Sequence, residues 1–182
     1  MDTLQVKWII GLVGERGTGK TSLIMDLLGI LQERKLKIAG VLSPGIFDGP
    51  QKIAIELIHL PSRQGRLLAV LHNDNETGMQ FGDWAFFQET LDWANEKLQE
   101  EPSCDLLVLD EIGPLELDFN RGLQSGLVFL AKGEYKLALL SLRPKCAAAI
   151  QERFSEIGLF SLEDLGREVV KDTVLRIANN IF

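Results

Sequence analysis

The residues best suited to chemistry form a glycine-rich run near the start of the chain, Gly14-Glu15-Arg16-Gly17-Thr18-Gly19-Lys20-Thr21. The run satisfies the pattern G-x-x-x-x-G-K-[ST], whose glycines let successive backbone N–H groups converge on phosphate oxygens. In this pattern the lysine, here Lys20, reaches the β- and γ-phosphates of a nucleotide, and the hydroxyl of Thr21 ligates Mg²⁺. Because the run follows an apolar segment and opens an amphipathic one, it predicts a nucleotide site at a helix N-terminus.

Nine residues of this segment are predicted to contact the nucleotide: Gly14, Glu15, Arg16, Gly17, Thr18, Gly19, Lys20, Thr21 and Ser22. Ser22 is placed to contact the α-phosphate. Glu15 and Arg16 fill variable positions of the pattern, and Arg16 is either a phosphate contact or, as we expect, a solvated side chain.

A second group of chemically suited residues ends the apolar run Leu106–Leu109, where Asp110 and Glu111 follow directly. Ligands of open α/β sheets bind at the carboxyl ends of the strands, so these carboxylates should lie beside Thr21. We expect Asp110 to hold Mg²⁺, in part through water, and Glu111 to polarise an attacking water as general base. Lys20 and Glu111 are therefore the predicted catalytic residues. The alternative is an acidic pair that simply begins a solvated loop.

Fast hydrolysis of a nucleotide also calls for a positive charge beside the γ-phosphate. The candidates are Arg143, which follows an apolar segment, and then Arg63 and Arg66. Ser141 is a candidate polar sensor of the γ-phosphate. For each of these residues we expect a surface or capping role, and the role beside the γ-phosphate is the alternative. No Asn-Lys-x-Asp guanine-reading motif is present, which favours loose base specificity covering ATP and GTP.

The elements that must position these residues alternate between strand and helix. Strands are predicted at Lys7–Val13, Lys37–Leu42, Leu106–Leu109 and Tyr135–Leu142, and an amphipathic helix at about residues 19–34. Such alternation is typical of βαβ units. We therefore expect an α/β fold, a three-layer P-loop domain with a mainly parallel sheet.

The middle of the chain departs from this rhythm. Turn signals between short apolar runs in Pro44–Leu71 predict an antiparallel β insertion at about residues 44–72, and His72–Gly82 reads as a loop. Apolar residues then recur at helical spacing from Trp84 to Leu98, with Asp83 available as N-cap. Length favours one domain over residues 1–182.

Three further helices are predicted towards the C-terminus. An apolar stripe from Phe119 to Leu130 ends at Gly133, a suitable C-cap. Pro144 is suited to the first position of a helix that runs to Phe154. A last helix carries apolar residues at one face: Val170, Val174, Ile177 and Ile181.

The composition of the chain disfavours some classes of binding partner. The 182 residues carry a formal net charge of −7, which disfavours nucleic acid and anionic membranes as partners. No apolar run approaches the roughly 18 residues of a membrane span, and Met1–Thr3 opens no signal peptide. Cys104 and Cys146 form no metal-binding pattern, so we expect two packing residues and a cytoplasmic location.

Other polar and aromatic residues receive plainer interpretations. His59 and His72 have no partner at ligand spacing and are predicted to be surface or incidental polar residues. Trp84, Phe87 and Trp93 are predicted core residues, although they could stack a base. The acidic residues between Glu89 and Asp118 are expected to be mostly the solvated face of a helix, with an unknown basic protein partner as the alternative.

Three segments together resemble a known family, the small P-loop nucleoside-triphosphatases first described in thermophiles and also called the cancer-related nucleoside-triphosphatase family. They are Gly14–Thr21, Lys37–Ser43 and, above all, Asp110-Glu111-Ile112-Gly113-Pro114-Leu115-Glu116-Leu117. The last segment matches the family pattern D-E-I-G-x-[ML]-E-[LM]. The resemblance implies a RecA-like core and Mg²⁺-dependent hydrolysis of several nucleoside triphosphates to diphosphate and phosphate.

By motif position the resemblance gives Lys20, Thr21, Asp110 and Glu111 the roles argued above, and it places Glu116 at the family's second acidic position. Glu116 is otherwise an ordinary residue before the next helix. After the second strand the family's arginines are missing, since the chain reads Pro44-Gly45-Ile46-Phe47-Asp48-Gly49. We therefore expect a divergent member. The alternatives to an NTPase are a nucleotide or small-molecule kinase and a nucleotide-dependent accessory protein with little basal turnover.

Overall fold

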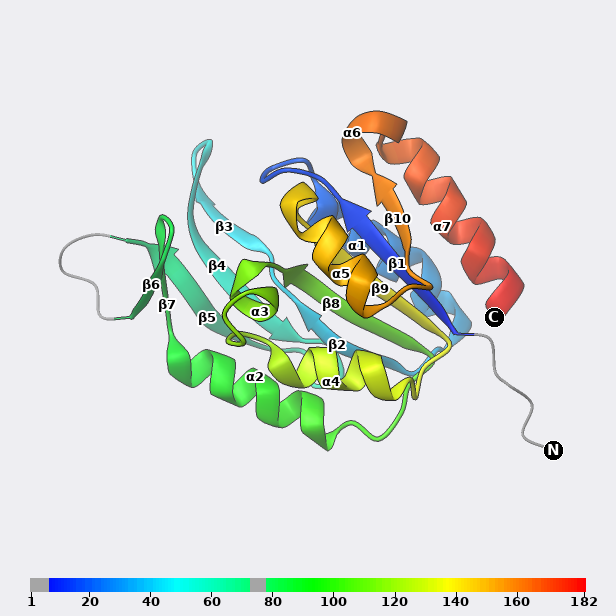
Figure 1. Ribbon diagram of the computed structural model, residues 1–182, viewed down its shortest axis with the longest axis horizontal. Coiled ribbons are helices and arrows are strands. Elements are labelled where there is room, and N and C mark those ends of the chain that lie inside the picture. The colour runs from blue at the N-terminus through cyan, green and yellow to red at the C-terminus, as the bar shows by residue number, and fades with distance from the viewer. Residues whose placement is uncertain (1–6, 73–77) are drawn as a thin grey trace.

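The computed structural model describes residues 7–72 and 78–182, in which ten strands form one sheet flanked by helices (Figure 1). The strands are β1 (Trp8–Val13), β2 (Ile38–Leu42), β3 (Gly45–Asp48), β4 (Gln51–His59), β5 (Gln64–Leu71), β6 (Met79–Phe81), β7 (Trp84–Phe86), β8 (Leu106–Ile112), β9 (Leu137–Leu142) and β10 (Gly158–Ser161). The α-helices are α1 (Lys20–Leu31), α2 (Gln88–Glu100), α3 (Pro114–Leu117), α4 (Gln124–Lys132), α5 (Ala147–Arg153), α6 (Leu162–Leu165) and α7 (Arg167–Ile181). Short 3₁₀ turns, η1 (Gln32–Arg34) and η2 (Pro144–Cys146), complete the chain.

One half of the sheet is parallel, in the order β10-β1-β9-β8-β2. The predicted parallel α/β core is therefore confirmed, and its four predicted strands all form. The strand β10 was not predicted, because Gly158–Ser161 is short and its residues are only half-buried at the edge of the sheet. In this order β9 separates β1 from β8, and the carboxyl ends of all three strands face the same edge.

Helices cover both faces of the parallel half and create two hydrophobic cores. Alternate residues of one strand divide between the cores: Ile9 packs on the side of α2, α4 and α5, and Ile10 on the side of α1 and α7. This division follows from the two-residue period of a strand. Because both faces are buried, β1, β8 and β9 read as continuous apolar runs.

The other half of the sheet is antiparallel and consists of β3 to β7, which extend the sheet beyond β2 (Figure 1). The predicted antiparallel insertion is confirmed, and it reaches further along the chain than residue 72. The segment expected to be a loop, His72–Gly82, contains β6, which pairs with β7. Residues 73–77 of that segment and the N-terminal Met1–Thr3 lie outside the described residues.

The start of the predicted helix at Trp84 is wrong. Trp84 belongs to β7 and pairs with Leu71 and Phe81, and α2 begins only at Gln88, with Phe87 as N-cap in place of Asp83. The 3–4 apolar spacing from Phe87 onward is helical, but Trp84 is buried by strand pairing instead. The helical spacing of apolar residues extends back to Trp84, but strand pairing decides the structure of this residue.

Two smaller predictions also change. Phe119 does not join the stripe of α4 and is 59% exposed, because it lies in the turn between α3 and α4. His59, expected to be a surface or incidental polar residue, is buried against Trp93 at the end of β4, where its Nδ1 hydrogen-bonds with Ser62. Burial lowers the pKa of His59. The burial of Trp84 and Trp93 and of both cysteines is as predicted.

Gly133 caps α4 in the left-handed conformation, as predicted. Pro144, predicted as the first residue of a helix, begins the 3₁₀ turn η2, and α5 starts only at Ala147. Within the described parts of the chain, none of the helices combines the length and apolar character that a membrane crossing needs.

Candidate functional site

The glycine-rich loop joins β1 to α1, as the sequence predicts. Gly17 and Gly19 have φ angles of 85° and 86°, a left-handed region that glycine enters without steric cost. Thr18 closes the turn by donating its hydroxyl to the carbonyl of Glu15 at 2.8 Å. A Cβ on Gly14 would lie only 2.5 Å from the Thr18 hydroxyl, so this position also requires glycine. The loop therefore has the backbone shape that its sequence pattern implies.

Lys20 begins α1 and its ammonium group is held above the loop. It donates to the carbonyl oxygens of Gly14 and Glu15, both at 2.7 Å. Partial burial lowers the pKa of Lys20, and the nearby carboxylates of Glu111 and Asp110 oppose that shift. The loop and the two acidic residues therefore meet at one place, as predicted.

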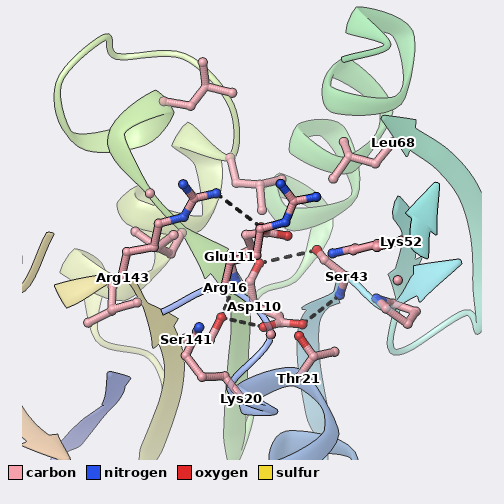
Figure 2. Close-up of a pocket in the computed structure, with 18 of the residues that line it drawn as sticks. Arg16, Lys20, Thr21, Ser43, Lys52, Leu68, Asp110, Glu111, Ser141 and Arg143 are labelled. Atoms are coloured by element: carbon pink, nitrogen blue, oxygen red, sulfur yellow. Dashed lines mark hydrogen bonds and ion pairs between the residues drawn. The ribbon is translucent and has the colours of Figure 1, made fainter. Parts of the chain in front are cut away.

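Asp110 lies at the carboxyl end of β8 and is fully buried. One of its carboxylate oxygens accepts from the backbone N–H of Ser43 at 3.0 Å, and the other from the hydroxyl of Ser141 at 2.5 Å (Figure 2). These two donors fix the carboxylate between the ends of β2 and β9. The sequence did not identify Ser43 as a site residue. Its only signal was its place directly after the second strand.

Glu111 has a strained backbone. Its φ angle is 72°, in the left-handed region that a non-glycine residue seldom enters, and the pairing of β8 with β9 shifts register between Leu109 and Ile112. The Glu111 N–H donates to the Ser141 hydroxyl at 2.7 Å, which holds this conformation. Such outliers collect at functional sites, where the surrounding structure maintains them.

The Glu111 side chain points into a cavity and keeps about a third of its surface, 37%, exposed. Desolvation raises the pKa of this carboxyl group, Lys52 opposes the shift, and Asp110 adds to it. A carboxylate whose pKa is raised is a better proton acceptor near neutral pH, which is what a general base requires. Lys52 comes from β4 of the antiparallel half and was not predicted as a site residue.

Ser141 lies at the site, but its sensor role is not supported. A hydroxyl has one proton to donate, and Ser141 gives it to the Asp110 carboxylate while accepting from the Glu111 N–H. No donor is left for a phosphate. Ser141 therefore positions both acidic residues.

The three candidate arginines separate clearly. The Arg143 guanidinium lies 3.9 Å from the Glu111 carboxylate and lines the same cavity (Figure 2). The Arg66 guanidinium lies 4.5 Å from the ring centre of Trp93, and neither Arg66 nor Arg63 lines that cavity. Of the three, the site gathers Arg143 alone.

Arg16 is not simply solvated. Its guanidinium lies 4.5 Å from the ring centre of Trp84 and 3.6 Å from the carboxylate of Asp83, and its side chain is 40% exposed. These contacts connect the glycine-rich loop to β7 of the antiparallel half, between residues that are far apart in sequence. Arg16 also lines the cavity, so the phosphate contact that the sequence left as the lesser reading is within its reach.

Glu116 has a structural role. It is buried in α3, and its carboxylate accepts from the N–H of Gly113 at 2.9 Å and from the N–H of Leu123 at 3.0 Å. These bonds join the two ends of the segment that follows β8. Burial raises the pKa of Glu116 from its ordinary 4.5 to about 7, even though the two N–H donors favour the charged form.

Lys20, Asp110, Glu111, Ser141 and Arg143 line one cavity of about 570 Å³, a volume typical of small-molecule sites. Its polar end is formed by the glycine-rich loop, Thr21, Asp110 and Glu111. Apolar side chains from the antiparallel strands β5 to β7 and from α2, α3 and the N-cap of α4 line the rest of it: Leu68, Phe81, Phe86, Leu91, Leu115 and Leu123. We refer to these six residues as the apolar lobe.

The donor set suits Mg²⁺ bound together with a polyphosphate. Across the described residues there is no group of three or more His, Cys, Asp or Glu side chains able to hold a metal by themselves. Mg²⁺ usually binds through one or two protein oxygens, waters and substrate phosphates. The Thr21 hydroxyl and the Asp110 carboxylate line the same cavity and offer this kind of partial coordination.

A comparison with protein-family models matches residues 9–175 to the family described as NTPase (NTPase_1). Among curated relatives, a nucleoside-triphosphatase THEP1 from Methanopyrus kandleri is 29% identical over 110 residues, which is 60% of this chain and 59% of the relative. A protein of the same name from Saccharolobus solfataricus is 28% identical over 108 residues, 58% of this chain and 60% of the relative. The matched part of the chain thus spans about three-fifths of the length of these relatives.

Two solved structures share the fold over nearly the whole chain. A human cancer-related nucleoside triphosphatase aligns with a TM-score of 0.68 and 18% identity, covering 94% of this chain and 97% of that one. THEP1 from Aquifex aeolicus aligns with a TM-score of 0.70 and 16% identity, covering 94% and 98%. The similarity extends through the antiparallel half of the sheet, since this half lies within the aligned length.

Proposed function

The chain belongs to this nucleoside-triphosphatase family, and from that membership we propose that it is a Mg²⁺-dependent nucleoside-triphosphatase with loose base specificity. It converts ATP, GTP and related triphosphates to the diphosphate and phosphate. The proposal takes residues 1–182 as one P-loop NTPase domain, because the parallel and antiparallel strands belong to a single sheet.

The glycine-rich loop and the N-terminus of α1 bind the triphosphate. Backbone N–H groups from Gly14 to Thr21 and the Ser22 hydroxyl surround the phosphates, and Lys20 moves from the loop carbonyls to the β- and γ-phosphates. Thr21 and Asp110 are the residues that would hold Mg²⁺, Asp110 through water, and the ion would neutralise charge on the two terminal phosphates. The fixed position of the Asp110 carboxylate between Ser43 and Ser141 supports this assignment.

Glu111 acts as the general base. It accepts a proton from a water that attacks the γ-phosphorus, while the bond to the β–γ bridging oxygen breaks and the diphosphate leaves. Arg143 stabilises the charge that develops on the γ-phosphoryl oxygens. The raised pKa of Glu111 and its position 3.9 Å from Arg143 support this pairing of base and cation.

The single observation that carries the proposal is the junction of loop and acidic strand end at one cavity. Lys20, Thr21, Asp110 and Glu111 all line it, although ninety positions separate the two pairs in sequence. This is the constellation that Mg²⁺-dependent hydrolysis of a nucleoside triphosphate requires.

Phosphate release from ATP, GTP, CTP and UTP, with and without Mg²⁺, tests the proposal. We expect release from all four triphosphates that depends on Mg²⁺. The Lys20→Ala variant should lose nucleotide binding and lower kcat/KM by at least about 10³-fold, since its charge is used on both terminal phosphates. Metal-independent release, or release that Lys20→Ala leaves intact, would contradict the proposed site.

A further inference from the structure

The apolar lobe has no role in hydrolysis. A triphosphate, Mg²⁺ and an attacking water need polar partners, and the loop, Lys20, the two acidic residues and Arg143 already supply them. Yet the cavity continues past Glu111 into a space walled by Leu68, Phe81 and other apolar side chains. Figure 2 shows Leu68 on the far side of Glu111 from Lys20 and Thr21.

The lobe adjoins the γ-phosphate end of a bound nucleotide. In the glycine-rich pattern Ser22 lies at the α-phosphate, and Lys20 lies at the β- and γ-phosphates. The base and sugar continue from the α-phosphate and therefore point away from Glu111. Leu115 and Leu123 line the same cavity as Glu111. Because Glu111 is the proposed base, the lobe is assigned to the side from which a nucleophile approaches the γ-phosphorus.

The walls of the lobe favour an uncharged apolar ligand. Leu68, Leu91, Leu115 and Leu123 are all buried side chains that cannot solvate a charge. Glu116 also lines the cavity, but its carboxylate is occupied by two backbone N–H groups. Of the charged side chains that line the cavity, Lys52 and Arg143 stand beside Glu111, and Arg16 is held by Trp84 and Asp83.

Resting on the proposed function, we infer that the apolar lobe binds a second substrate, a small apolar alcohol, and that the chain transfers the γ-phosphoryl group to its hydroxyl. The alcohol oxygen forms the new bond to the γ-phosphorus as the bond to the β–γ bridging oxygen breaks. The hydroxyl proton passes to Glu111, and the nucleoside diphosphate leaves with the electron pair of the broken bond. Hydrolysis is then the same reaction with water in place of the alcohol.

The lobe gives this transfer an advantage over hydrolysis. Apolar walls hold the carbon skeleton and orient its hydroxyl between Glu111 and the phosphorus, which converts a bimolecular attack into one within a complex. The apolar walls themselves offer an attacking water no hydrogen-bond partner, so they position water less well than a carbon skeleton. Slow turnover with water alone follows from this arrangement.

Transfer can be measured with ATP labelled at the γ-phosphate. The probes are 3-methylbutan-1-ol, benzyl alcohol and geraniol, and ethanol and glycerol are the polar controls. We expect the apolar alcohols to carry label as phosphate monoesters and to raise ADP formation at least about fivefold, whereas the controls leave both unchanged. If the label appears only in inorganic phosphate for all three probes while hydrolysis proceeds, the inference is overturned.

Two neighbouring residues of β5 provide a matched pair of variants. Leu68 is 5% exposed and lines the lobe, whereas Leu67 is 42% exposed and lies outside this cavity. Leu68→Trp fills the lobe and should abolish transfer while hydrolysis continues, and Leu67→Trp should preserve both. Where Leu68→Trp does not fold, Phe86→Ala widens the lobe and should shift preference towards geraniol.

Three further outcomes would contradict either this inference or the proposed function. Equal loss of transfer in Leu67→Trp and Leu68→Trp would place the alcohol elsewhere and overturn the inference. A raised KM for ATP in Leu68→Trp would assign the lobe to the base of the nucleotide and overturn it as well. Hydrolysis that persists in Lys20→Ala would instead defeat the proposed function itself.

Discussion

The two halves of the sheet bury and expose their residues in different ways. The parallel strands β10-β1-β9-β8-β2 are covered by helices on both faces and end at one edge, where Lys20, Asp110 and Glu111 gather. The antiparallel strands β3 to β7 have α2 against one face and leave apolar side chains exposed elsewhere, including Phe47, Ile53 and Leu67. The parallel half therefore supplies the charged groups Lys20, Asp110 and Glu111, and the antiparallel half supplies one wall of the cavity.

Substitutions in the two halves of the sheet are therefore expected to have different effects. The loop, the acidic pair and Arg143 belong to the parallel half, and they are the groups that phosphate chemistry needs. The antiparallel half contributes Lys52, Leu68 and the Trp84 surface on which Arg16 rests. Changes in the first group should alter the chemical step, and changes in the second should alter stability or the choice of nucleophile.

The largest expected effect comes from Glu111→Gln in the parallel half. The amide keeps the size of the side chain but cannot accept a proton, so hydrolysis should fall about 10²- to 10⁴-fold while nucleotide binding persists. Single-turnover hydrolysis and titration with a fluorescent ATP analogue measure the two quantities. A normal hydrolysis rate would remove Glu111 from the role of base.

The counterpart in the antiparallel half is Leu57→Ala. Leu57 is fully buried in β4, so truncation should lower the free energy of unfolding by about 2–5 kcal/mol, yet hydrolysis per folded molecule should stay within about twofold. Urea unfolding and hydrolysis at low temperature provide the two readings, with the exposed Leu67→Ala as control. If folded Leu57→Ala lost hydrolysis to the same extent as Glu111→Gln, the chemical step would not depend on the parallel half alone.

The raised pKa of Glu116 predicts that the stability of the folded chain depends on pH. Its pKa is raised from 4.5 to about 7 in the folded chain, so the folded state binds more protons than the unfolded state between these values. Stability should therefore fall as pH rises from about 4.5 to about 7, by on the order of 3 kcal/mol, and level off above. In Glu116→Gln this slope should disappear.

The exposed neighbour Asp118 gives the matched control, since Asp118→Asn should leave the slope unchanged. Urea unfolding at several pH values measures all three proteins. If Glu116→Gln retains the full slope, the titrating group is another residue.

The smallest expected effect is that of Arg143→Ala, on the order of a 10-fold loss of hydrolysis, because this guanidinium is already paired with Glu111. The charge of Arg143 lowers the pKa of Glu111, so its removal should move the acid limb of the pH–rate profile to higher pH. Arg143→Lys should restore the limb in part. If the pH–rate profile of Arg143→Ala is unchanged, Arg143 does not affect the pKa of Glu111.

Much of the parallel half could be predicted because its signals are local. Buried strands read as continuous apolar runs, and the glycine-rich loop needs only eight consecutive residues to specify its shape. The acidic pair was found because it directly ends such a run. The antiparallel half was predicted only in outline, since Trp84 continues a helical pattern but is buried by pairing with Leu71 and Phe81.

By itself the sequence determined the loop from Gly14 to Ser22, the acidic pair and the alternation that brings their strands to one edge. These features depend on residues close together in the chain and on backbone preferences that hold in any fold. The tertiary structure alone decided that Ser43 and Ser141 hold Asp110, that Arg16 rests on Trp84, and that an apolar lobe opens beside Glu111. Each of these joins residues that are far apart in sequence, and their contacts are set by the order and pairing of the strands and not by any local pattern.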